Sequence, residues 1–346
     1  MSRYASLVMI GFNRPEIQRK TLERVAKAED SDKRDIYVFI DGPRKGRDDD
    51  VANAQKVFEV FKEFRELKLP RMTIRKREVN LGCRGNIIAS ITEVINKTDR
   101  VIVVEDDILV SETFFTYHDS ALDMYEGDKR IWCINAYVHD RMKLPWSYSK
   151  DVFLTRRFMC FGWSTWKDRW NDVDFDLKCW PEFSADPSNL KFMNDCSTML
   201  LPAVKMQLEN PNTWDVQCSF HIARKKMYSI NPRYSLTKNN GSGAGVHSLK
   251  FDYVTAKHKY YNFIPKLELE IKPDDKILEI SKYMAIGRPS SINIALRKLV
   301  GLSTMTTEAR PSVLERIKFR LRRFFAKTPI VPWCMEPIEL RPKNEA

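Results

Sequence analysis

A run of four aliphatic residues, 101–104, leads directly into three consecutive acids, Glu105, Asp106 and Asp107. A short, wholly apolar run of this kind is typical of a strand buried on both faces. Adjacent carboxylates repel one another, and burying them beside an apolar strand is unfavourable. A divalent cation resolves this conflict, because Mg²⁺ and Mn²⁺ prefer oxygen ligands and often combine one or two carboxylates with substrate phosphates. The alternative interpretation is an exposed acidic turn that precedes a helix.

The first 110 residues alternate short apolar runs with amphipathic stretches. Strands are expected at residues 7–12, 36–40, 72–74 and 101–104. Pro15 fits the first turn of the helix that runs to about residue 28, and Asn86 is the expected N-cap of the helix before the acidic triplet. This alternation predicts an α/β fold with a mainly parallel sheet flanked by helices. Ligands of such sheets bind at the carboxyl ends of the strands, where both Asp41 and the triplet lie.

After residue 110 the pattern is mixed. Ser111 is a candidate N-cap for a helix that ends at Tyr125. A strand at 131–136, a helix at 214–222 and a glycine-containing loop at 239–248 are also expected. We therefore divide the chain into a donor-binding half (1–136), an acceptor and catalytic half (137–260) and a C-terminal extension (261–346).

The charge of the chain is uneven. Lys and Arg exceed Asp and Glu by 58 to 46, and residues 316–327 hold six basic residues and no acid, which is half of the net charge of +12. Such a chain favours anionic partners. The seven cysteines form no CxxC pair, and the sequence has neither a long apolar span nor a signal-peptide layout, so we expect reduced thiols in a cytoplasmic enzyme.

Four stretches, in order, carry a resemblance to a known family. They are VIVVEDDILVSETFFTYHDSALDMYEGDKRIWCINA (101–136), FMCFGW (158–163), the pair Trp214-Asp215, and a proline-then-glycine segment (232–248). Together they resemble the family of N-acetylglucosaminyltransferase I, the transferase that begins complex N-glycan branching, and the chain is also similar to bacterial family-2-like sugar transferases. The resemblance implies a GT-A fold, with a Rossmann-like half joined to an acceptor-binding half, and an inverting glycosyltransferase.

The resemblance also implies how a nucleotide-sugar donor is held. Asp107 would bind Mn²⁺, or Mg²⁺, directly, while Asp106 and Glu105 would hold the ribose and the water shell of the metal. Asp41 matches the position of a uracil-binding aspartate, which favours a UDP-sugar. Arg14 follows the first strand and is expected to meet the diphosphate through charge-assisted contacts. The alternative for Arg14 is an ordinary solvated charge.

For the acceptor side, the resemblance makes Asp215 the general base that takes the proton from the acceptor hydroxyl. Phe161 and Trp163 would form a wall facing the sugar, with Trp214 beside the donor, although core packing competes for both wall residues. His247, in the glycine loop, would assist the metal or a phosphate, and the loop would close over the donor. A solvent-facing His247 is the alternative.

The sequence departs from the family in two respects. Val216 and Gln217 follow Asp215, where the family often has another acid, and the N-terminal membrane span that is typical of the family is absent from this sequence. These departures favour a cytosolic, bacterial-type branch that builds surface polysaccharide or lipid-linked glycans. The sugar, the acceptor and the linkage therefore do not carry over from the resemblance.

The C-terminal extension contains a basic amphipathic helix. Leu314, Ile317, Leu321 and Phe324 recur at helical spacing among basic residues. Such helices lie in membrane interfaces, which predicts a peripheral position on the inner face of an anionic membrane, close to lipid-linked acceptors. The alternative is a terminal helix that packs on its own domain or on a second subunit.

Three other function classes remain as alternatives. The net charge permits a nucleic-acid-binding protein, but no signature of such a protein is present, so no nucleic acid is expected as a partner. A nucleotidyltransferase usually carries a glycine-rich phosphate loop near the first strand, where residues 11–15 hold a single glycine. A donor-binding protein that has lost catalysis is the third alternative, because the base assignment depends on Asp215 alone.

Overall fold

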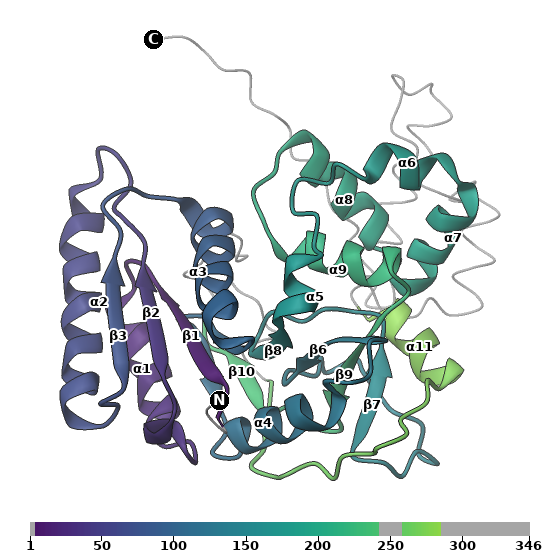
Figure 1. The fold of residues 1–346 in the computed structure, drawn as a ribbon, viewed down its shortest axis with the longest axis horizontal. Helices are drawn as coiled ribbons and strands as arrows, with labels where there is room; N and C mark the ends of the chain where they lie inside the picture. Colours follow the sequence, from purple (N-terminus) through teal and green to yellow (C-terminus); the bar gives the residue numbers. More distant parts are fainter. Residues whose placement is uncertain (1–3, 242–257, 285–346) are drawn as a thin grey trace, which may run out of the picture. The chain divides into compact units, whose positions relative to one another are not determined.

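The computed structural model describes residues 4–241 and 258–284, and residues Met1–Lys282 form one compact unit. Its centre is an eight-stranded sheet in the order β3-β2-β1-β4-β8-β6-β9-β7 (Figure 1). The strands are β1 (Ser6–Gly11), β2 (Ile36–Ile40), β3 (Met72–Lys76), β4 (Arg100–Val104), β6 (Ile131–Asn135), β7 (Val152–Thr155), β8 (Trp163–Trp166) and β9 (Tyr228–Pro232). A separate two-stranded ribbon pairs β5 (Ile108–Val110) with β10 (Thr237–Asn239).

Strand direction follows the sequence prediction for the N-terminal half. The pairs β1–β2, β2–β3 and β1–β4 are all parallel, as is β6–β9. Only β8 and β7 run against their neighbours in this sheet. The predicted α/β fold with a mainly parallel sheet is confirmed, whereas the insertion of antiparallel β8 between β4 and β6 was not part of the prediction.

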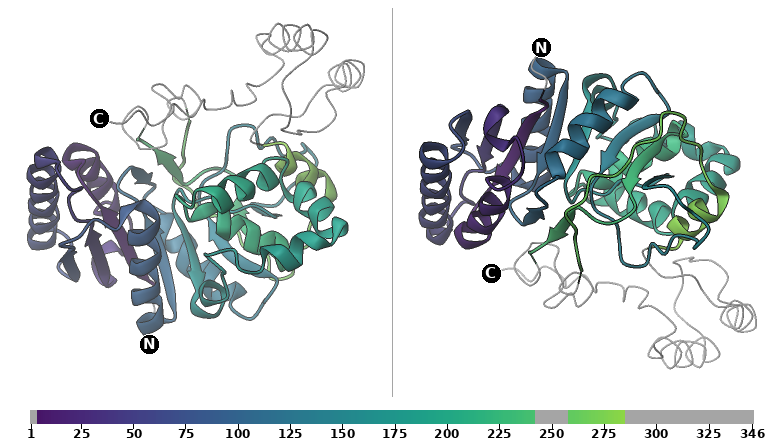
Figure 2. Two further views of the ribbon diagram at one scale, coloured as in Figure 1. Left: turned by 90° about the horizontal axis from the view of Figure 1, so that it is seen from above. Right: turned by 90° about the horizontal axis from the view of Figure 1, so that it is seen from below.

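Helices cover both faces of the sheet, and strand residues alternate between the two cores. On one face, Leu7 and Met9 of β1 pack with α1 (Pro15–Val25), α2 (Asp48–Leu67) and α4 (Phe114–Tyr125). On the other face, Val8 packs in the core that holds α3 (Gly82–Thr98), α5 (Lys167–Asn171) and α9 (Asp215–Arg224). This alternation with a period of two is what a strand buried on both faces requires. The elements up to α3, coloured purple to blue, lie to one side of the later teal and green elements (Figures 1 and 2).

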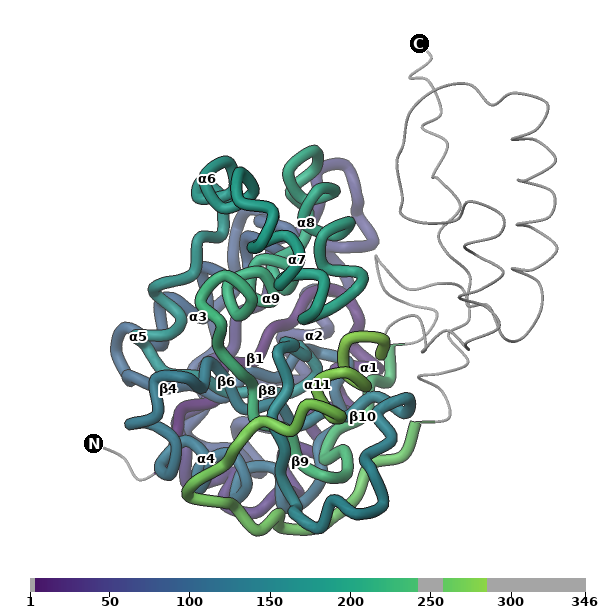
Figure 3. Tube along the Cα trace, turned by 90° about the vertical axis from the view of Figure 1, so that its right-hand side faces the viewer, coloured from purple at the N-terminus to yellow at the C-terminus, as the bar shows by residue number. Residues whose placement is uncertain are grey.

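A third, smaller core lies among the helices that follow β8. It joins α6 (Trp180–Ala185), α7 (Pro187–Cys196) and α8 (Leu200–Glu209) to the outer face of α9. These three helices gather together, with α9 beneath them (Figures 1 and 3). Because α9 contributes to two cores, its first residue is held firmly in place. The last described helix is α11 (Asp275–Lys282).

Two predicted helix starts are wrong. Helix α3 begins at Gly82, so Asn86 lies inside it, buried, where its Oδ1 accepts a hydrogen bond from Nε of Arg77 at 2.6 Å. Helix α4 begins at Phe114, three residues after Ser111, whose carbonyl accepts the Phe114 N–H at 3.3 Å. The predicted cap Asn86 instead binds Arg77, and the predicted cap Ser111 instead lies in a turn that precedes the helix.

The structure leaves the domain division and the basic C-terminal helix untested. The division at residues 136 and 260 stays a prediction, and the basic helix at 314–324 lies outside the described residues. Within the ranges that the structure describes, no helix is both long enough and apolar enough to cross a membrane.

Candidate active site

The carboxyl ends of three neighbouring parallel strands meet at one edge of the sheet. Strand β1 ends at Gly11, three residues before Arg14, β2 ends at Ile40, next to Asp41, and β4 ends at Val104, next to the triplet Glu105-Asp106-Asp107. Because β1 lies between β2 and β4, the loop that carries Arg14 stands between the two acidic loops. Arg14, Asp41 and the triplet therefore all lie at the carboxyl edge of the sheet, which is where ligands of such sheets bind.

Arg14 neutralises part of the triplet. Its Nε donates to Oδ2 of Asp106 at 2.9 Å, one terminal nitrogen donates to Oδ1 of the same carboxylate, and that nitrogen lies 3.2 Å from Oδ2 of Asp107. Burial alone lowers the pKa of Arg14, but the two carboxylates outweigh burial and raise it, so the guanidinium stays charged. The other terminal nitrogen is buried and makes no hydrogen bond within the described residues.

One guanidinium does not balance the negative charge. Burial, and then the charge of Asp106, raises the pKa of Asp107 to about 6, although Arg14 opposes this shift. Burial raises the pKa of Glu105 well above its usual value, and the charges of Asp107, Asp106 and Asp215 add to the effect. The site therefore holds more negative charge than the described part of the chain compensates.

Asp41 organises the loop beside the triplet. Its Oδ1 accepts the backbone N–H groups of Gly42 at 3.0 Å and Leu81 at 2.9 Å, and its Oδ2 accepts the side-chain amide of Asn80 at 3.1 Å. Burial raises the pKa of Asp41, while the backbone hydrogen bonds oppose the shift. Asp41 thus ties the end of β2 to the start of α3, and its expected contact with a nucleobase stays a prediction.

Asp215 approaches the triplet from the other half of the sheet. It is the first residue of α9, where the positive end of the helix dipole favours a carboxylate. Thr213 donates its hydroxyl hydrogen bond to Oδ1 of Asp215. The preceding Trp214 is buried, with its ring centroid 5.6 Å from that of Trp163. The charge of Asp215 contributes to the raised pKa of Glu105, so the two carboxylates lie within electrostatic reach.

The sequence matches the GNT-I family over residues 2–188, which is more than half of the 346 residues. The chain belongs to the GNT-I family. It is thus a nucleotide-sugar-dependent glycosyltransferase, and its sheet is GT-A-like. The family match includes Arg14, Asp41 and the triplet, whereas Asp215 lies beyond it.

Solved glycosyltransferase structures match this GNT-I family chain at low identity and low TM-score. The mannosyltransferase PcManGT from Pyrobaculum calidifontis, solved with GDP-Man and Mn²⁺, is 11% identical, with 94% of this chain and 81% of that chain covered and a TM-score of 0.45. The galactosyltransferase LgtC, solved with donor and acceptor sugar analogues, is 15% identical, with coverages of 52% and 65% and a TM-score of 0.30. TarS of S. aureus is 14% identical, with 36% of this chain and 20% of that chain covered and a TM-score of 0.29. This chain therefore spans about a fifth of the length of that protein. Such low identities and scores say nothing about the ligands of this chain.

The two aromatic residues predicted to face the sugar differ in burial in this GNT-I family member. Trp163 is fully buried and stacks between Trp132 and Trp214, with ring centroids 5.8 and 5.6 Å away. The prediction that Trp163 faces the sugar is therefore wrong for this structure, because the side chain fills the core beneath the site, and the buried Trp214 shares that core. Phe161 is only partly buried, and its ring packs edge-on against Tyr137 at 4.9 Å.

The loop after β10 reaches the triplet. The Asn240 N–H donates to the carbonyl oxygen of Asp107 at 2.7 Å. A Cβ atom on Gly241 would stand 2.2 Å from Oδ2 of Asp107, so only glycine fits against this carboxylate without a shift. His247 lies outside the described residues, and its predicted role stays a prediction.

Sequence reasoning missed three residues at the site. Thr21 of α1 donates to the carbonyl oxygen of Asp106 at 2.7 Å, and Thr213 holds Asp215. Cys160 lies close enough that, after burial, the charges of Glu105 and Asp215 raise its thiol pKa well above the usual value. Thr213 could have been found from its place two residues before Asp215, whereas nothing in the sequence signals Thr21.

The residues present fit a hard divalent cation. Within residues 4–241 and 258–284, no group of three or more His, Cys, Asp or Glu side chains is arranged so that it could hold a metal by itself. Asp106 is committed to Arg14, but Asp107 has one weak contact with Arg14, and Glu105 has no ion-pair partner among the described side chains. One or two carboxylates suffice where a phosphate ligand and water complete the shell of Mg²⁺ or Mn²⁺.

Proposed function

We propose that this GNT-I family member is a metal-assisted, inverting glycosyltransferase whose donor site is the edge formed by Arg14, Asp41 and the triplet. The observation that carries the proposal is the pair of buried carboxyl groups of Asp107 and Glu105, whose pKa values are raised, with the charge of Asp215 on α9 adding to the shift of Glu105. Two separate acidic elements suit a transfer that needs a donor-binding group on one side of the sugar and a base on the other.

Asp107 and Glu105 are the residues that would hold Mn²⁺ or Mg²⁺, and Arg14 would position the donor diphosphate. Bound there, the cation would neutralise charge that develops on the leaving diphosphate. The buried nitrogen of Arg14 that lacks a partner is a donor ready for a phosphate oxygen. Asp106 fixes the guanidinium, so its role is to position Arg14 rather than to bind the donor itself.

Asp215 would act as the general base. Its carboxylate takes the proton from the acceptor hydroxyl while that oxygen forms a bond to the anomeric carbon, and the bond from the anomeric carbon to the diphosphate breaks with its electron pair leaving on the diphosphate. Two features hold and orient the carboxylate of Asp215: the N-terminus of α9 and the hydrogen bond from Thr213. The buried Trp214 anchors the residue before it.

A UDP-sugar is the favoured donor because Asp41 stands at the end of β2, beside the expected nucleotide. Burial makes the position selective for a ligand that donates hydrogen bonds, such as the N–H group of a uracil. The favoured acceptor is a glycan or a lipid-linked glycan, with the basic C-terminal segment at an anionic membrane on the cytoplasmic side. Equal binding to anionic liposomes with and without residues 310–346 would exclude the membrane part of this proposal.

The experiment that tests the donor site is calorimetric titration of UDP, GDP and dTDP, each with Mn²⁺ and with chelator. We expect micromolar binding of UDP that is lost with chelator and in Asp107→Ala. Glu66→Ala, a change of an exposed acid on α2, is the matched control and should bind as wild type does. Tight binding of UDP that neither chelator nor Asp107→Ala affects would contradict a metal at this site.

A further inference from the structure

A second polar site lies where the end of β5 meets the end of α1 and the segment 260–262. A cavity of about 120 Å³ is lined by Arg24 in the last turn of α1 and Lys27 just after that helix, by Ser111 and Glu112 after β5, and by Tyr260 and Asn262. A single water needs only ~15 Å³ of such space. The cavity therefore has room for a group larger than one water molecule.

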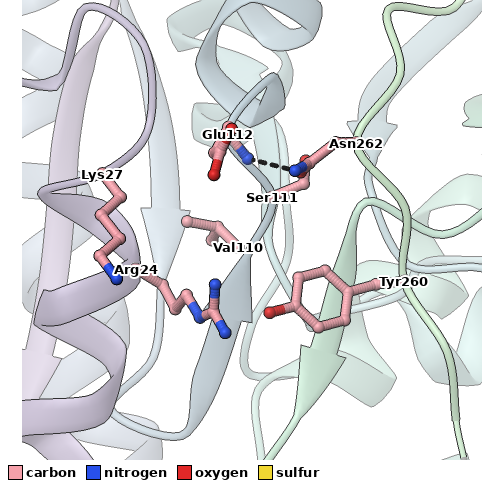
Figure 4. Close-up of a pocket in the computed structure, with 7 residues that line it drawn as sticks. All are labelled: Arg24, Lys27, Val110, Ser111, Glu112, Tyr260 and Asn262. Carbon is pink, nitrogen blue, oxygen red and sulfur yellow. Dashed lines mark hydrogen bonds between the residues drawn. The ribbon is translucent and has the colours of Figure 1, made fainter.

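The two cations at this cavity have no partner of their own. Neither Arg24 nor Lys27 makes a side-chain hydrogen bond or ion pair with the portion of the chain that the structure describes. Figure 4 shows the Arg24 guanidinium and the Tyr260 hydroxyl pointing toward one another across the cavity. A basic residue in the last turn of α1 is favoured by the helix dipole, but the dipole does not require Arg24 to turn toward Tyr260.

The frame of the cavity is fixed. The Asn262 side-chain oxygen accepts the backbone N–H of Glu112 at 2.9 Å, and the carbonyl oxygen of Glu112 accepts the Glu29 N–H at 2.9 Å. These bonds join the 260–262 segment and the end of α1 to the same residue after β5. The backbone segments that carry the donors are therefore joined before any ligand arrives, although the Arg24 and Lys27 side chains themselves are exposed.

The cavity is near the donor edge but separate from it. Arg24 follows Thr21, which touches Asp106, by one turn of helix α1. Val110, at the cavity, lies three residues beyond Asp107, a separation of roughly 10 Å along an extended strand. An anion in the cavity would thus sit beside the donor site without sharing its carboxylates.

We propose that this cavity is an oxyanion-binding site that takes a phosphate group. Guanidinium, ammonium and phenol donors line it, a donor set that binds phosphate oxygens, and the two cations outnumber the one carboxylate in the lining, that of Glu112. The phosphate could belong to a larger amphiphilic ligand or be free in solution. The first source is suggested by Tyr234, Tyr261 and Phe263, which pack together on the neighbouring segment while Tyr234 and Tyr261 remain about half exposed.

Calorimetric titration of the full-length protein in chelator, without nucleotide, tests the site with three probes: inorganic phosphate, inorganic diphosphate and geranyl diphosphate. We expect inorganic phosphate to bind wild type at least about tenfold more tightly than it binds Arg24→Gln/Lys27→Gln, the size of effect that loss of charge-assisted hydrogen bonds gives. The matched control Lys56→Gln/Lys62→Gln removes two exposed positive charges from α2 and should bind phosphate as wild type does.

Further variants separate this site from the donor site. Asp107→Ala should keep phosphate binding, since its loss in that variant would place the anion at the donor edge and overturn the proposal. Tyr260→Phe should weaken phosphate binding severalfold. Equal phosphate binding by wild type and Arg24→Gln/Lys27→Gln, or none by wild type, would also overturn the proposal. Inorganic diphosphate is the reference for the lipid probe, because it carries the same phosphate groups: tighter binding of geranyl diphosphate than of inorganic diphosphate would identify an amphiphilic ligand, and equal binding of the two would identify a free phosphate.

Discussion

Arg14 and Asp106 form a two-point pair at the centre of the candidate site, with Nε 2.9 Å from Oδ2 and a second bond to Oδ1. Both side chains are mostly buried. Breaking a buried pair by removing one partner is costly because the other charge is left uncompensated. We therefore expect Arg14→Ala to lower the free energy of unfolding by about 3 kcal/mol, measured by urea denaturation at pH 7.

Arg19→Ala is the control for that experiment, because Arg19 lies on the same helix and pairs with Glu63 at the surface. Exposed pairs of this kind contribute little to stability. Equal, small effects of the two substitutions would show that the triplet does not depend on Arg14.

The raised pKa of Asp107 predicts a pH dependence of stability. Its pKa is about 6 in the folded protein against an ordinary value of 3.8. Between these pH values the folded state holds a proton that the unfolded state has released, so the contribution of Asp107 to stability falls as pH rises from about 4 to about 6. In chelator, Asp107→Asn should be as stable as wild type near pH 4 and more stable, by up to about 3 kcal/mol, above pH 6.

Urea denaturation of the two proteins across this pH range measures the difference directly. Asp32→Asn, which changes an exposed acid, should track wild type at every pH. A stability difference between Asp107→Asn and wild type that does not vary with pH would contradict the assigned pKa.

The contact between Gly241 and Asp107 predicts a specific loss of donor binding. A Cβ at residue 241 would stand 2.2 Å from Oδ2 of Asp107, so either the loop or the carboxylate must move. We expect Gly241→Ala to weaken metal-dependent UDP binding by about tenfold, or about 1.4 kcal/mol, with the thermal unfolding midpoint unchanged. Gly127→Ala, where an added Cβ meets open space, should bind UDP as wild type does.

The position of Trp163 separates two interpretations of the aromatic segment. As a core residue between Trp132 and Trp214, it should tolerate Trp163→Phe at a loss of about 1–3 kcal/mol in unfolding free energy, with UDP affinity retained. Trp146→Phe, at a position that is 97% exposed, should leave stability unchanged. Loss of UDP affinity without loss of stability in Trp163→Phe would restore the predicted sugar-facing wall.

The strands and their parallel pairing could be predicted because they depend on the local pattern of apolar residues in the sequence. The aliphatic run before Glu105 allows little other than a buried strand, and parallel pairing then brings Asp41 and the triplet to one edge. The role of Trp163 could not be predicted, because an aromatic residue next to a glycine suits a core and a ligand wall equally. Its burial depends on pairing between β4 and β8, which are more than 55 residues apart in the sequence.

The start of α3 shows the same limit at a smaller scale. Asn86 is a good N-cap by type, yet Gly82, with φ of +69°, turns the chain into the helix four residues earlier. Asn86 is then free to accept the hydrogen bond from Arg77. Only the contact between the two residues, which sequence spacing does not specify, decides between the alternatives.

Asp215→Asn tests the assignment of the base. The amide retains the size of the carboxylate but cannot accept a proton from the acceptor, so turnover should fall by about 10²–10⁴-fold. Release of UDP from UDP-sugars in the presence of an acceptor mixture measures turnover, and calorimetry should show that Mn²⁺-dependent UDP binding is retained. Asp172→Asn, which removes a surface partner of Lys225, is the control. Unchanged turnover in Asp215→Asn would assign the base to another residue, and loss of UDP binding would instead place Asp215 in the donor site.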